Sequence, residues 1–371
     1  MKLVDRITSE TFSIELPIWQ SPNGNVLDLH FEPTFNTGVI AKRSNGLWRY
    51  REALPIAQDM HIVSIDEGFT PLLKIDFGGK IVGIKQEQLF SSGSYKDRGA
   101  TVLMSHIKSL GINNVVQDSS GNAGCAVAAY AAFAGIGCTI FLQEDTSRTK
   151  IAQMEAYGAK IKFIMGSRED VAGATLIAAQ QTYYASHSWN PFFFHGTKTF
   201  AYEVCEQLGW KAPDSVVLPA GNGTLIIGCY IGFTDLLKAS LIDKMPKIIA
   251  VQSINCSPLA VAFAQNKTMY NEVITQPTLA EGIAIAKPLR GNQMLEYVRK
   301  SKGHFIVVTE AEIKSAWLEC AQKGFYIEPT SAATIAGLKK YMEGYPNEQI
   351  ISLFSGHGLK STDKILKMLA N

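Results

Sequence analysis

One lysine in a glycine- and serine-rich segment is the residue best suited to covalent chemistry in this sequence. Lys96 follows Ser91-Ser92-Gly93-Ser94-Tyr95 and stands at the predicted start of a helix. The positive end of a helix and burial both favour the neutral form of an amine, which is the form that attacks a carbonyl carbon to make an imine. A lysine considered alone is most often a solvated surface residue, so Lys96 needs other groups around it.

Three polar, glycine-rich loops follow predicted strands and could supply those groups. They are Ser119-Ser120-Gly121-Asn122-Ala123-Gly124, Gly221-Asn222-Gly223 and Ser355-Gly356-His357-Gly358. Open parallel sheets bind ligands at the carboxyl ends of their strands, where helix N-termini present backbone N–H groups. The first loop offers hydroxyls and an amide, the second N–H groups suited to a phosphate, and the third one hydroxyl. The G-x-G-x-x-G and G-x-x-x-x-G-K-[ST] patterns are missing, which disfavours dinucleotide and ATP binding.

Short β-branched runs alternate with alanine-rich stretches, and this alternation predicts the elements that position the loops. Strands are predicted at 114–116, 138–142, 160–165, 215–219, 247–252, 305–308 and 350–354, and helices at 125–133, 150–157, 170–184, 224–237 and 309–322. Residues 73–84, broken by Gly78-Gly79, predict a hairpin. We expect an α/β protein with two open α/β domains and mainly parallel sheets.

The predicted division of the chain has three parts. Residues 1–60 are expected to form an irregular N-terminal extension. Residues 61–90 with 201–371 are expected to form the larger α/β domain. Residues 91–200 are expected to form the smaller one, with Lys96 and the Ser-Gly-Asn loop.

Composition narrows the classes of protein. The 371 residues are 46% hydrophobic and 18% charged, which excludes disorder for most of the chain. The net charge is +2 with no basic stripe, so neither nucleic acid nor anionic lipid is an expected partner. No apolar window reaches the ~18 residues of a membrane span, and the N-terminus lacks a signal core, so we expect a cytoplasmic protein. The six cysteines stand singly, and we expect buried thiols and no metal site.

Four segments, in this order, resemble the pyridoxal-phosphate enzymes of the tryptophan-synthase-β fold type (fold type II), and most closely the threonine synthases. They are residues 93–99, 120–122, 221–225 and 355–360, and the lead-in segments 47–55 and 66–72 are similar too. The likeness covers about residues 47–360. The Lys96 and Ser355 segments are specific, whereas each glycine loop alone is a weak signal. The resemblance implies that pyridoxal 5'-phosphate lies in the cleft between the two domains.

The resemblance also implies roles for individual cofactor-binding residues. Lys96 would hold the cofactor as a Schiff base and transfer protons, and Asn122 would bind its 3′-oxygen. Ser355 would face the pyridine nitrogen, and because a neutral hydroxyl does not keep that nitrogen protonated, elimination and replacement would be favoured over transamination. The cofactor phosphate would be held by Gly221, Asn222, Gly223, Thr224 and Leu225.

The same comparison implies a substrate-binding group. The substrate carboxylate would be bound by Ser119, Ser120, Gly121 and Ala123, and Lys198 would lie nearby. Simple helix capping explains the two serines equally well. His357, between two glycines, is either a close-packed loop residue, a hydrogen-bonding support or, less often, a catalytic group.

The sequence departs from threonine synthases where a phosphorylated substrate would matter. The family's Asn-Pro-Tyr-Arg is Asn190-Pro191-Phe192-Phe193 here, so Phe193 replaces an arginine suited to bidentate phosphate binding. The aromatic run 192–194 predicts either a core strand or the lining of a less polar pocket. A phosphate could instead be bound by Lys198, Arg148 or His195.

The resemblance implies a lyase that converts O-phosphohomoserine and water to threonine and phosphate. An alternative is β-elimination or β-replacement on serine, threonine or an O-activated serine, since residues 281–283 and 328–333 resemble that wider group. A second alternative is a regulatory relative that binds the cofactor without turnover. We expect a small amino-acid substrate and a homodimer.

Overall fold

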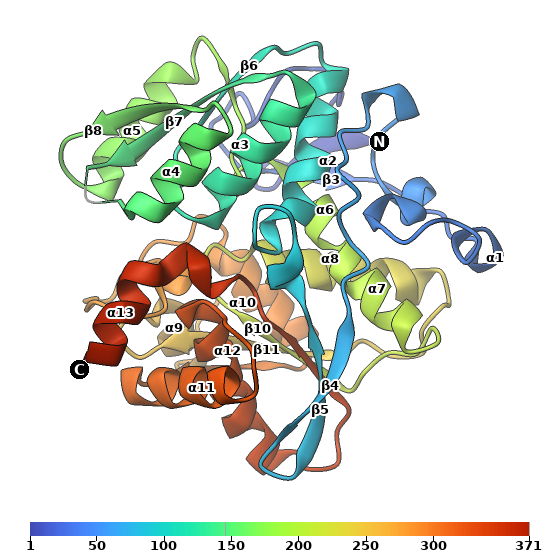
Figure 1. Cartoon of the computed structure of the whole chain (residues 1–371). Helices are drawn as coiled ribbons and strands as arrows, with labels where there is room; N and C mark the ends of the chain where they lie inside the picture. The colour runs from blue at the N-terminus through green and yellow to red at the C-terminus, as the bar shows by residue number, and fades with distance from the viewer. Residues whose placement is uncertain (145, 371) are drawn as a thin grey trace. The chain divides into compact units, whose positions relative to one another are not determined.

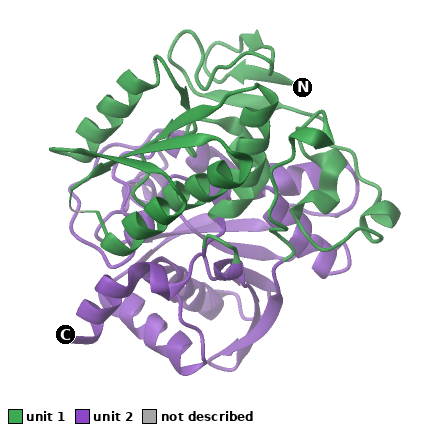
Figure 2. Ribbon diagram, turned by 45° about the horizontal axis from the view of Figure 1, so that its top comes forward, with its two compact units in different colours: residues 1–69, 90–92, 96–197 green, residues 70–89, 93–95, 198–371 purple. Residues whose placement is uncertain are grey.

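The computed structural model describes residues 1–144 and 146–370, and the chain forms two compact units. The first unit consists of residues 1–69, 90–92 and 96–197, and the second of residues 70–89, 93–95 and 198–371 (Figure 2). The chain therefore crosses between the units within the Ser91–Lys96 segment. The sequence predicted three domains, with residues 1–60 as a separate extension. That division into domains stays a prediction.

The second unit is built on a six-stranded sheet with the order β12-β11-β10-β13-β5-β4 (Figure 1). All neighbouring strands are parallel except β4 and β5, which form the predicted antiparallel hairpin. The strands are β4 (Leu72–Phe77), β5 (Lys80–Lys85), β10 (Ser215–Pro219), β11 (Lys247–Ser253), β12 (His304–Val308) and β13 (Ile350–Leu353). Strands β10, β5 and β13 lie together in the interior of the sheet and deliver their carboxyl ends to one edge.

Helices cover this sheet and close its core. Helix α12 packs against β10, β11, β12 and β13, and α8 packs against β10 and β11. Helix α11 begins with the predicted capping box, in which Thr309 and Glu312 bond each other's backbone N–H groups. The helices of the unit are α7 (Thr199–Gln207), α8 (Thr224–Lys238), α9 (Pro258–Ala264), α10 (Gly291–Lys300), α11 (Glu310–Gln322), α12 (Pro329–Gly344) and α13 (Thr362–Ala370), with 3₁₀ turns η3 (Glu87–Leu89), η4 (Glu281–Ile283) and η5 (Gly358–Ser361).

The first unit contains a parallel four-stranded sheet with the order β8-β7-β6-β9. Its strands are β6 (Asn114–Gln117), β7 (Gly137–Gln143), β8 (Lys160–Ile164) and β9 (Tyr183–Tyr184). Its main helices are α2 (Lys96–Ser109), α3 (Asn122–Ala134), α4 (Arg148–Ala156), α5 (Arg168–Ala178) and α6 (Pro191–Thr197). Helices α3 and α5 both pack against β7. Helix α3 ends at Gly135, whose φ of 68° is the left-handed conformation that glycine adopts without strain.

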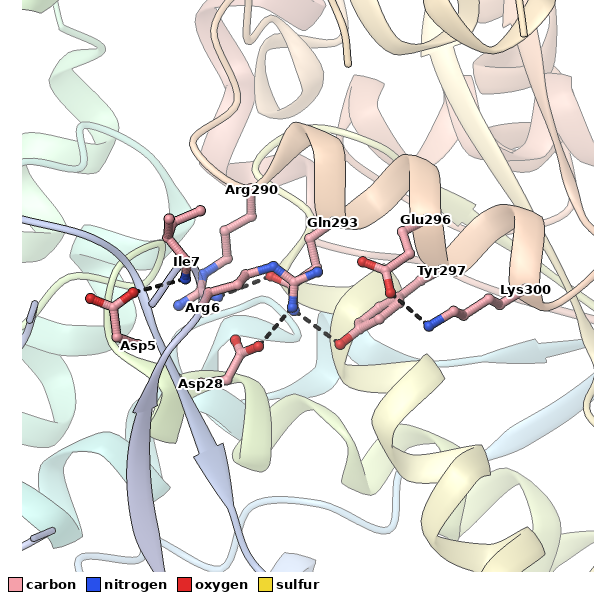
Figure 3. Close-up of polar contacts among 9 residues, drawn as sticks. All are labelled: Asp5, Arg6, Ile7, Asp28, Arg290, Gln293, Glu296, Tyr297 and Lys300. Carbon is pink, nitrogen blue, oxygen red and sulfur yellow. Dashed lines mark hydrogen bonds and ion pairs between the residues drawn. The ribbon is translucent and has the colours of Figure 1, made fainter. Parts of the chain in front are cut away.

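The N-terminal residues are more regular than expected. They form a three-stranded antiparallel sheet of β1 (Lys2–Asp5), β2 (Thr11–Phe12) and β3 (Leu27–His30), followed by α1 (Thr37–Ile40) and the 3₁₀ turns η1 (Leu47–Ala53) and η2 (Asp59–His61). Asp5 accepts a hydrogen bond from the Ile7 N–H, and Arg6 pairs with Asp28 at 2.7 Å (Figure 3). Strands of two to four residues are too short to show a period-two pattern, so the prediction of irregular structure here is wrong.

Two other expectations differ from the structure. The predicted helix 170–184 ends at Ala178, and its last two residues form β9. The aromatic run 192–194 lies in α6 and not in a core strand.

All six cysteines are buried. Among the described residues, no helix is long and apolar enough to cross a membrane, and no cluster of metal-binding side chains occurs.

Candidate active site

Lys96 is the first residue of α2, so it stands at the positive end of a helix of 14 residues. The preceding loop is fixed by Asp97, which is fully buried and accepts hydrogen bonds from both the backbone N–H and the hydroxyl of Ser92. The start of the helix is therefore held in one conformation. A lysine held in this way can present its amine to a bound carbonyl with little loss of entropy.

An aromatic ring lies beside this lysine. The Nζ atom of Lys96 is 5.8 Å from the ring centroid of Phe193, which is fully buried on α6. A Cβ atom built on Gly99 would lie 2.2 Å from that ring, and one built on Gly196 would lie 1.9 Å from the carbonyl oxygen of Arg98. Two glycines thus allow α2 and α6 to approach closely. The residue that replaces the family's arginine forms part of this tight packing.

His187 is a buried histidine close to the same group. Its ring contacts Phe193 edge to face, with 6.0 Å between centroids. Burial, followed by the positive charges of Lys96 and Arg168, holds the pKa of His187 well below its usual value. His187 is therefore neutral at physiological pH and can act as a hydrogen-bonding group, though not as an anion-binding cation.

The predicted carboxylate loop forms a tight turn in the first unit. Ser119 accepts a hydrogen bond from the Gly121 N–H within the turn. The N-cap residue of α3 is Gly121, so neither serine is the helix cap considered from the sequence. A Cβ atom on Gly124 would lie 2.0 Å from the Ser119 carbonyl oxygen, so only glycine lets the loop fold back on α3. Asn122 is the first residue of α3 and is half-buried, as are Ser120 and Gly121, whereas Ala123 is buried. The N–H groups of this first turn have no carbonyl partner within the helix and suit a carboxylate.

The predicted phosphate loop connects β10 to α8 in the second unit. Gly223 has a φ of 81°, and a Cβ atom there would lie 2.5 Å from the sulfur of Met294. A Cβ atom on Gly221 would lie 2.5 Å from the Gly282 carbonyl oxygen. Asn222 lies between these glycines, and Thr224 and Leu225 begin α8. The loop is a narrow cradle that leads directly into the amino end of a 15-residue helix.

The hydroxyl of Thr224 is also tied to the lysine segment. It lies 2.9 Å from the hydroxyl of Tyr95, which immediately precedes Lys96 in the sequence. Burial raises the pKa of Tyr95, so this phenol stays protonated. The backbone N–H of Tyr95 donates to the Ser355 carbonyl oxygen at 3.1 Å. Tyr95 therefore connects two of the predicted cofactor-binding segments within the second unit.

Ser355 follows β13 and is fully buried. Its hydroxyl donates to Oε1 of Glu328 at 2.8 Å and lies 2.9 Å from the hydroxyl of Ser331. The sequence singled out residues 328–333 only as a resemblance and gave Glu328 and Ser331 no role. Nothing in the local pattern could reveal these contacts, because they join residues 24 and 27 positions apart in the chain.

The structure gives Lys198 a protein partner. Its Nζ atom is fully buried and lies 2.9 Å from Oδ2 of Asp235, which also accepts a 2.5 Å hydrogen bond from Tyr202. Burial lowers the pKa of Lys198, and the Asp235 carboxylate opposes this change. The predicted role of Lys198 in substrate binding stays a prediction, and the observed contacts are structural.

The residues present fit pyridoxal phosphate. The cradle at Gly221 and Gly223 would be filled by any side chain, and it presents helix N-terminal N–H groups to a phosphate. A lysine at a fixed helix start supplies the amine that this cofactor requires, and Ser355 supplies a hydroxyl at the carboxyl end of a central strand. The chain thus has groups suited to the phosphate, the aldehyde and the ring.

Comparison with known proteins agrees with this chemistry. Residues 63–356 match the family model described as pyridoxal-phosphate dependent enzyme. The threonine synthase of Methanocaldococcus jannaschii is 33% identical, with 96% of this chain and 92% of that protein covered. The threonine synthase of Mycobacterium tuberculosis is 34% identical, with 86% of this chain and 89% of that protein covered.

Solved structures confirm the fold class. Threonine deaminase isoform 2 from Solanum lycopersicum aligns with a TM-score of 0.70 and 22% identity, covering 81% of this chain and 83% of that one. Maize serine racemase aligns with a TM-score of 0.66 and 22% identity, covering 82% and 94%. The α/β fold with mainly parallel sheets is that of fold type II. The chain is a pyridoxal-phosphate-dependent enzyme and belongs to the threonine synthase family.

Proposed function

We propose that this enzyme converts O-phosphohomoserine and water to threonine and phosphate. The observation that carries the proposal is the likeness to threonine synthases along 96% of the chain. Every segment predicted to bind the cofactor lies within residues 63–356, which match the pyridoxal-phosphate family model. The geometry within each unit supports it, because each predicted segment occupies a strand end or a helix start.

Each group would have one task at the site. The cofactor, when bound, would withdraw electrons from the substrate α carbon. The amine of Lys96 would hold the cofactor and then move protons at the substrate's α and β carbons. The residues proposed to hold the cofactor phosphate are Gly221, Asn222, Gly223, Thr224 and Leu225, and Asn122 and Ser355 are proposed to contact its ring. The N–H groups and hydroxyls of residues 119–123 would orient the substrate carboxylate.

We infer that arginine, and not Lys198, binds the substrate phosphate. The Lys198 ammonium already has the Asp235 carboxylate. Arg148 and Arg168 are the exposed first residues of α4 and α5. The positive charge of Arg168, like that of Lys96, lowers the pKa of His187. Of the two variants Arg148→Ala and Arg168→Ala, the one that removes the phosphate-binding arginine should raise the KM for O-phosphohomoserine about tenfold or more. Lys162→Ala, an exposed cation on β8, is the control.

The test of the proposed function is product stoichiometry. Wild-type enzyme should release threonine and phosphate in equal amounts from O-phosphohomoserine. Lys96→Ala should abolish both products and the borohydride-reducible link to the cofactor, whereas Lys108→Ala, on the same helix, should change neither. Phosphate release without threonine would contradict the assignment.

One observation favours a second candidate function. Phe193 places an apolar ring 5.8 Å from the Lys96 amine, where the family has an arginine. A less polar site would suit elimination from serine or threonine. Formation of a 2-oxo acid and ammonia from either amino acid, faster than turnover of O-phosphohomoserine, would establish this alternative.

We also propose a cytoplasmic homodimer. Six buried free thiols suit a reducing compartment, where disulfides do not persist. Sedimentation of the purified enzyme would measure its assembly, and a single species with the mass of one chain would contradict the dimer.

A further inference from the structure

Tyr95 immediately precedes the lysine proposed to hold the cofactor, and its phenol is buried in the second unit. The side chain is 8% exposed, and its hydroxyl oxygen lies 2.9 Å from the hydroxyl oxygen of Thr224, which is 1% exposed. Buried polar groups are stable when they bond to one another, as these two do. The proposed function uses the Thr224 hydroxyl and gives the Tyr95 hydroxyl no task.

Backbone hydrogen bonds hold the Tyr95 segment in place. The Tyr95 N–H donates to the Ser355 carbonyl oxygen at 3.1 Å, and the His357 N–H donates to the Gly93 carbonyl oxygen at 2.9 Å. A short antiparallel β-bridge joins the same two segments. Because the main chain makes these bonds, removal of the phenol hydroxyl would leave the aromatic ring where it is.

Thr224 stands where a helix can bind a phosphate. It is the first residue of α8 and directly follows Gly223, whose carbonyl oxygen accepts the Ile227 N–H at 2.9 Å. The N–H groups of residues 224–226 have no carbonyl partner within the helix, and such groups suit an anion. The Thr224 hydroxyl belongs to this first turn, so the contact with Tyr95 joins the phenol to the predicted phosphate loop.

The chemistry of the two hydroxyls indicates which one donates. Burial raises the pKa of the Tyr95 phenol, the Thr224 hydroxyl opposes this change, and the charges of Glu328 and Glu87 add to it, so the phenol keeps its proton. A phenol is more acidic than an alcohol and is the better donor, and a threonine hydroxyl that accepts one bond still has its own proton to donate. The oxygens of a phosphate dianion only accept, and they attract that proton strongly.

We propose that Tyr95 is a positioning residue for the cofactor phosphate: its hydroxyl donates to Thr224, so that the Thr224 proton is directed to the phosphate. The proposal rests on the proposed function, in which residues 221–225 hold that phosphate. Successive hydrogen bonds in a buried chain strengthen one another. Because Tyr95 is covalently bonded to Lys96, this residue also links the phosphate site to the lysine that would hold the cofactor aldehyde.

The experiment compares two ligands, of which only one carries the phosphate. Pyridoxal 5'-phosphate and 5'-deoxypyridoxal are each titrated into the full chain after its cofactor has been removed, and binding is followed by absorbance. Tyr95→Phe keeps the ring and the backbone bonds and removes only the hydroxyl. It should raise the Kd for pyridoxal 5'-phosphate about 3- to 10-fold, the loss expected for one hydrogen bond, and leave the Kd for 5'-deoxypyridoxal within about twofold.

A double-mutant cycle tests the route through Thr224. Thr224→Val should raise the Kd for pyridoxal 5'-phosphate about 10- to 100-fold, the loss expected for a hydrogen bond to a charged group. Tyr95→Phe added to Thr224→Val should then raise it by less than about twofold more. Tyr341→Phe is the matched control, because this buried phenol of the same unit donates to Glu348 at 2.7 Å and should leave both affinities unchanged.

The outcomes separate this inference from the proposed function. Equal weakening of both ligands by Tyr95→Phe would show a structural role and overturn the inference, and so would unchanged binding of both. An unchanged affinity of Thr224→Val for pyridoxal 5'-phosphate would contradict the proposed phosphate site itself. Should Thr224→Val fail to fold, the comparison of the two ligands in Tyr95→Phe still decides the inference.

Discussion

Replacing Asp235 with leucine should destabilise the enzyme strongly. The variant would leave the Lys198 ammonium fully buried without its carboxylate at 2.9 Å. Breaking a buried ion pair by removing one partner costs about 3 to 5 kcal/mol. An independent figure agrees: neutralising a lysine of ordinary pKa at pH 7 costs about 4 to 5 kcal/mol, at about 1.4 kcal/mol per pH unit.

The assay is equilibrium urea unfolding of the holoenzyme followed by circular dichroism. Glu296→Gln is the control, because the Glu296–Lys300 pair on α10 is exposed and should contribute less than about 1 kcal/mol (Figure 3). The loss in free energy of unfolding caused by Asp235→Leu should become smaller as pH rises from 7 toward 10. In that range the unfolded chain binds the lysine proton and the folded variant does not, so stability increases with pH.

The same pair decides the role of Lys198. Lys198→Met should lower the free energy of unfolding and leave the KM for O-phosphohomoserine within about twofold, because we assign the side chain to structure. Two results together would refute this reasoning: Asp235→Leu lowers the free energy of unfolding by less than about 1 kcal/mol, and Lys198→Met raises the KM tenfold or more.

Three further predictions test the site and its packing. Gly223→Ala and Gly209→Ala each place alanine at a positive φ, of 81° and 70°, so each should lower the free energy of unfolding in urea by about 1 to 2 kcal/mol. Only Gly223→Ala should also weaken cofactor binding in a titration, because a Cβ atom at Gly223 meets neighbouring atoms and one at Gly209, the control, does not. His106 is buried, and burial lowers its pKa to about 3. As pH falls from 6.5 to 3, the unfolded chain binds a proton that the folded chain does not, so the free energy of unfolding should fall by up to about 1.4 kcal/mol per pH unit. His106→Phe should flatten this slope, and an unchanged slope would contradict the prediction. Phe193→Arg should lower the melting temperature without tightening O-phosphohomoserine binding, because the buried ring packs tightly on Gly99 and a longer, charged side chain would be buried in its place; tighter binding in a stable variant would show the reverse.

Local sequence patterns predicted the elements that place the candidate site. The run 215–219 is continuously apolar and ends in glycines, so its strand and the following helix were predicted within one residue of β10 and α8. The capping box at Thr309 likewise depends on residues three apart, and the structure confirms it. Such features are encoded within a few neighbouring residues.

Features that depend on distant residues could not be predicted. The close packing of Phe193, on α6, against Gly99 joins residues 94 positions apart, and a run of three aromatics is equally typical of a strand. The contacts of Ser355 with Glu328, and of Lys198 with Asp235, join segments 27 and 37 positions apart. A sequence shows that these residue types exist, but only the fold shows that they meet.

The most direct test of the central claim is a comparison of kcat/KM for O-phosphohomoserine, serine and threonine with the wild-type holoenzyme. The proposed function predicts that O-phosphohomoserine is preferred by at least about 100-fold, since a charged group recognised by hydrogen bonds contributes about 1.5 to 3 kcal/mol and more when bidentate. Preference for serine or threonine would contradict the threonine synthase activity.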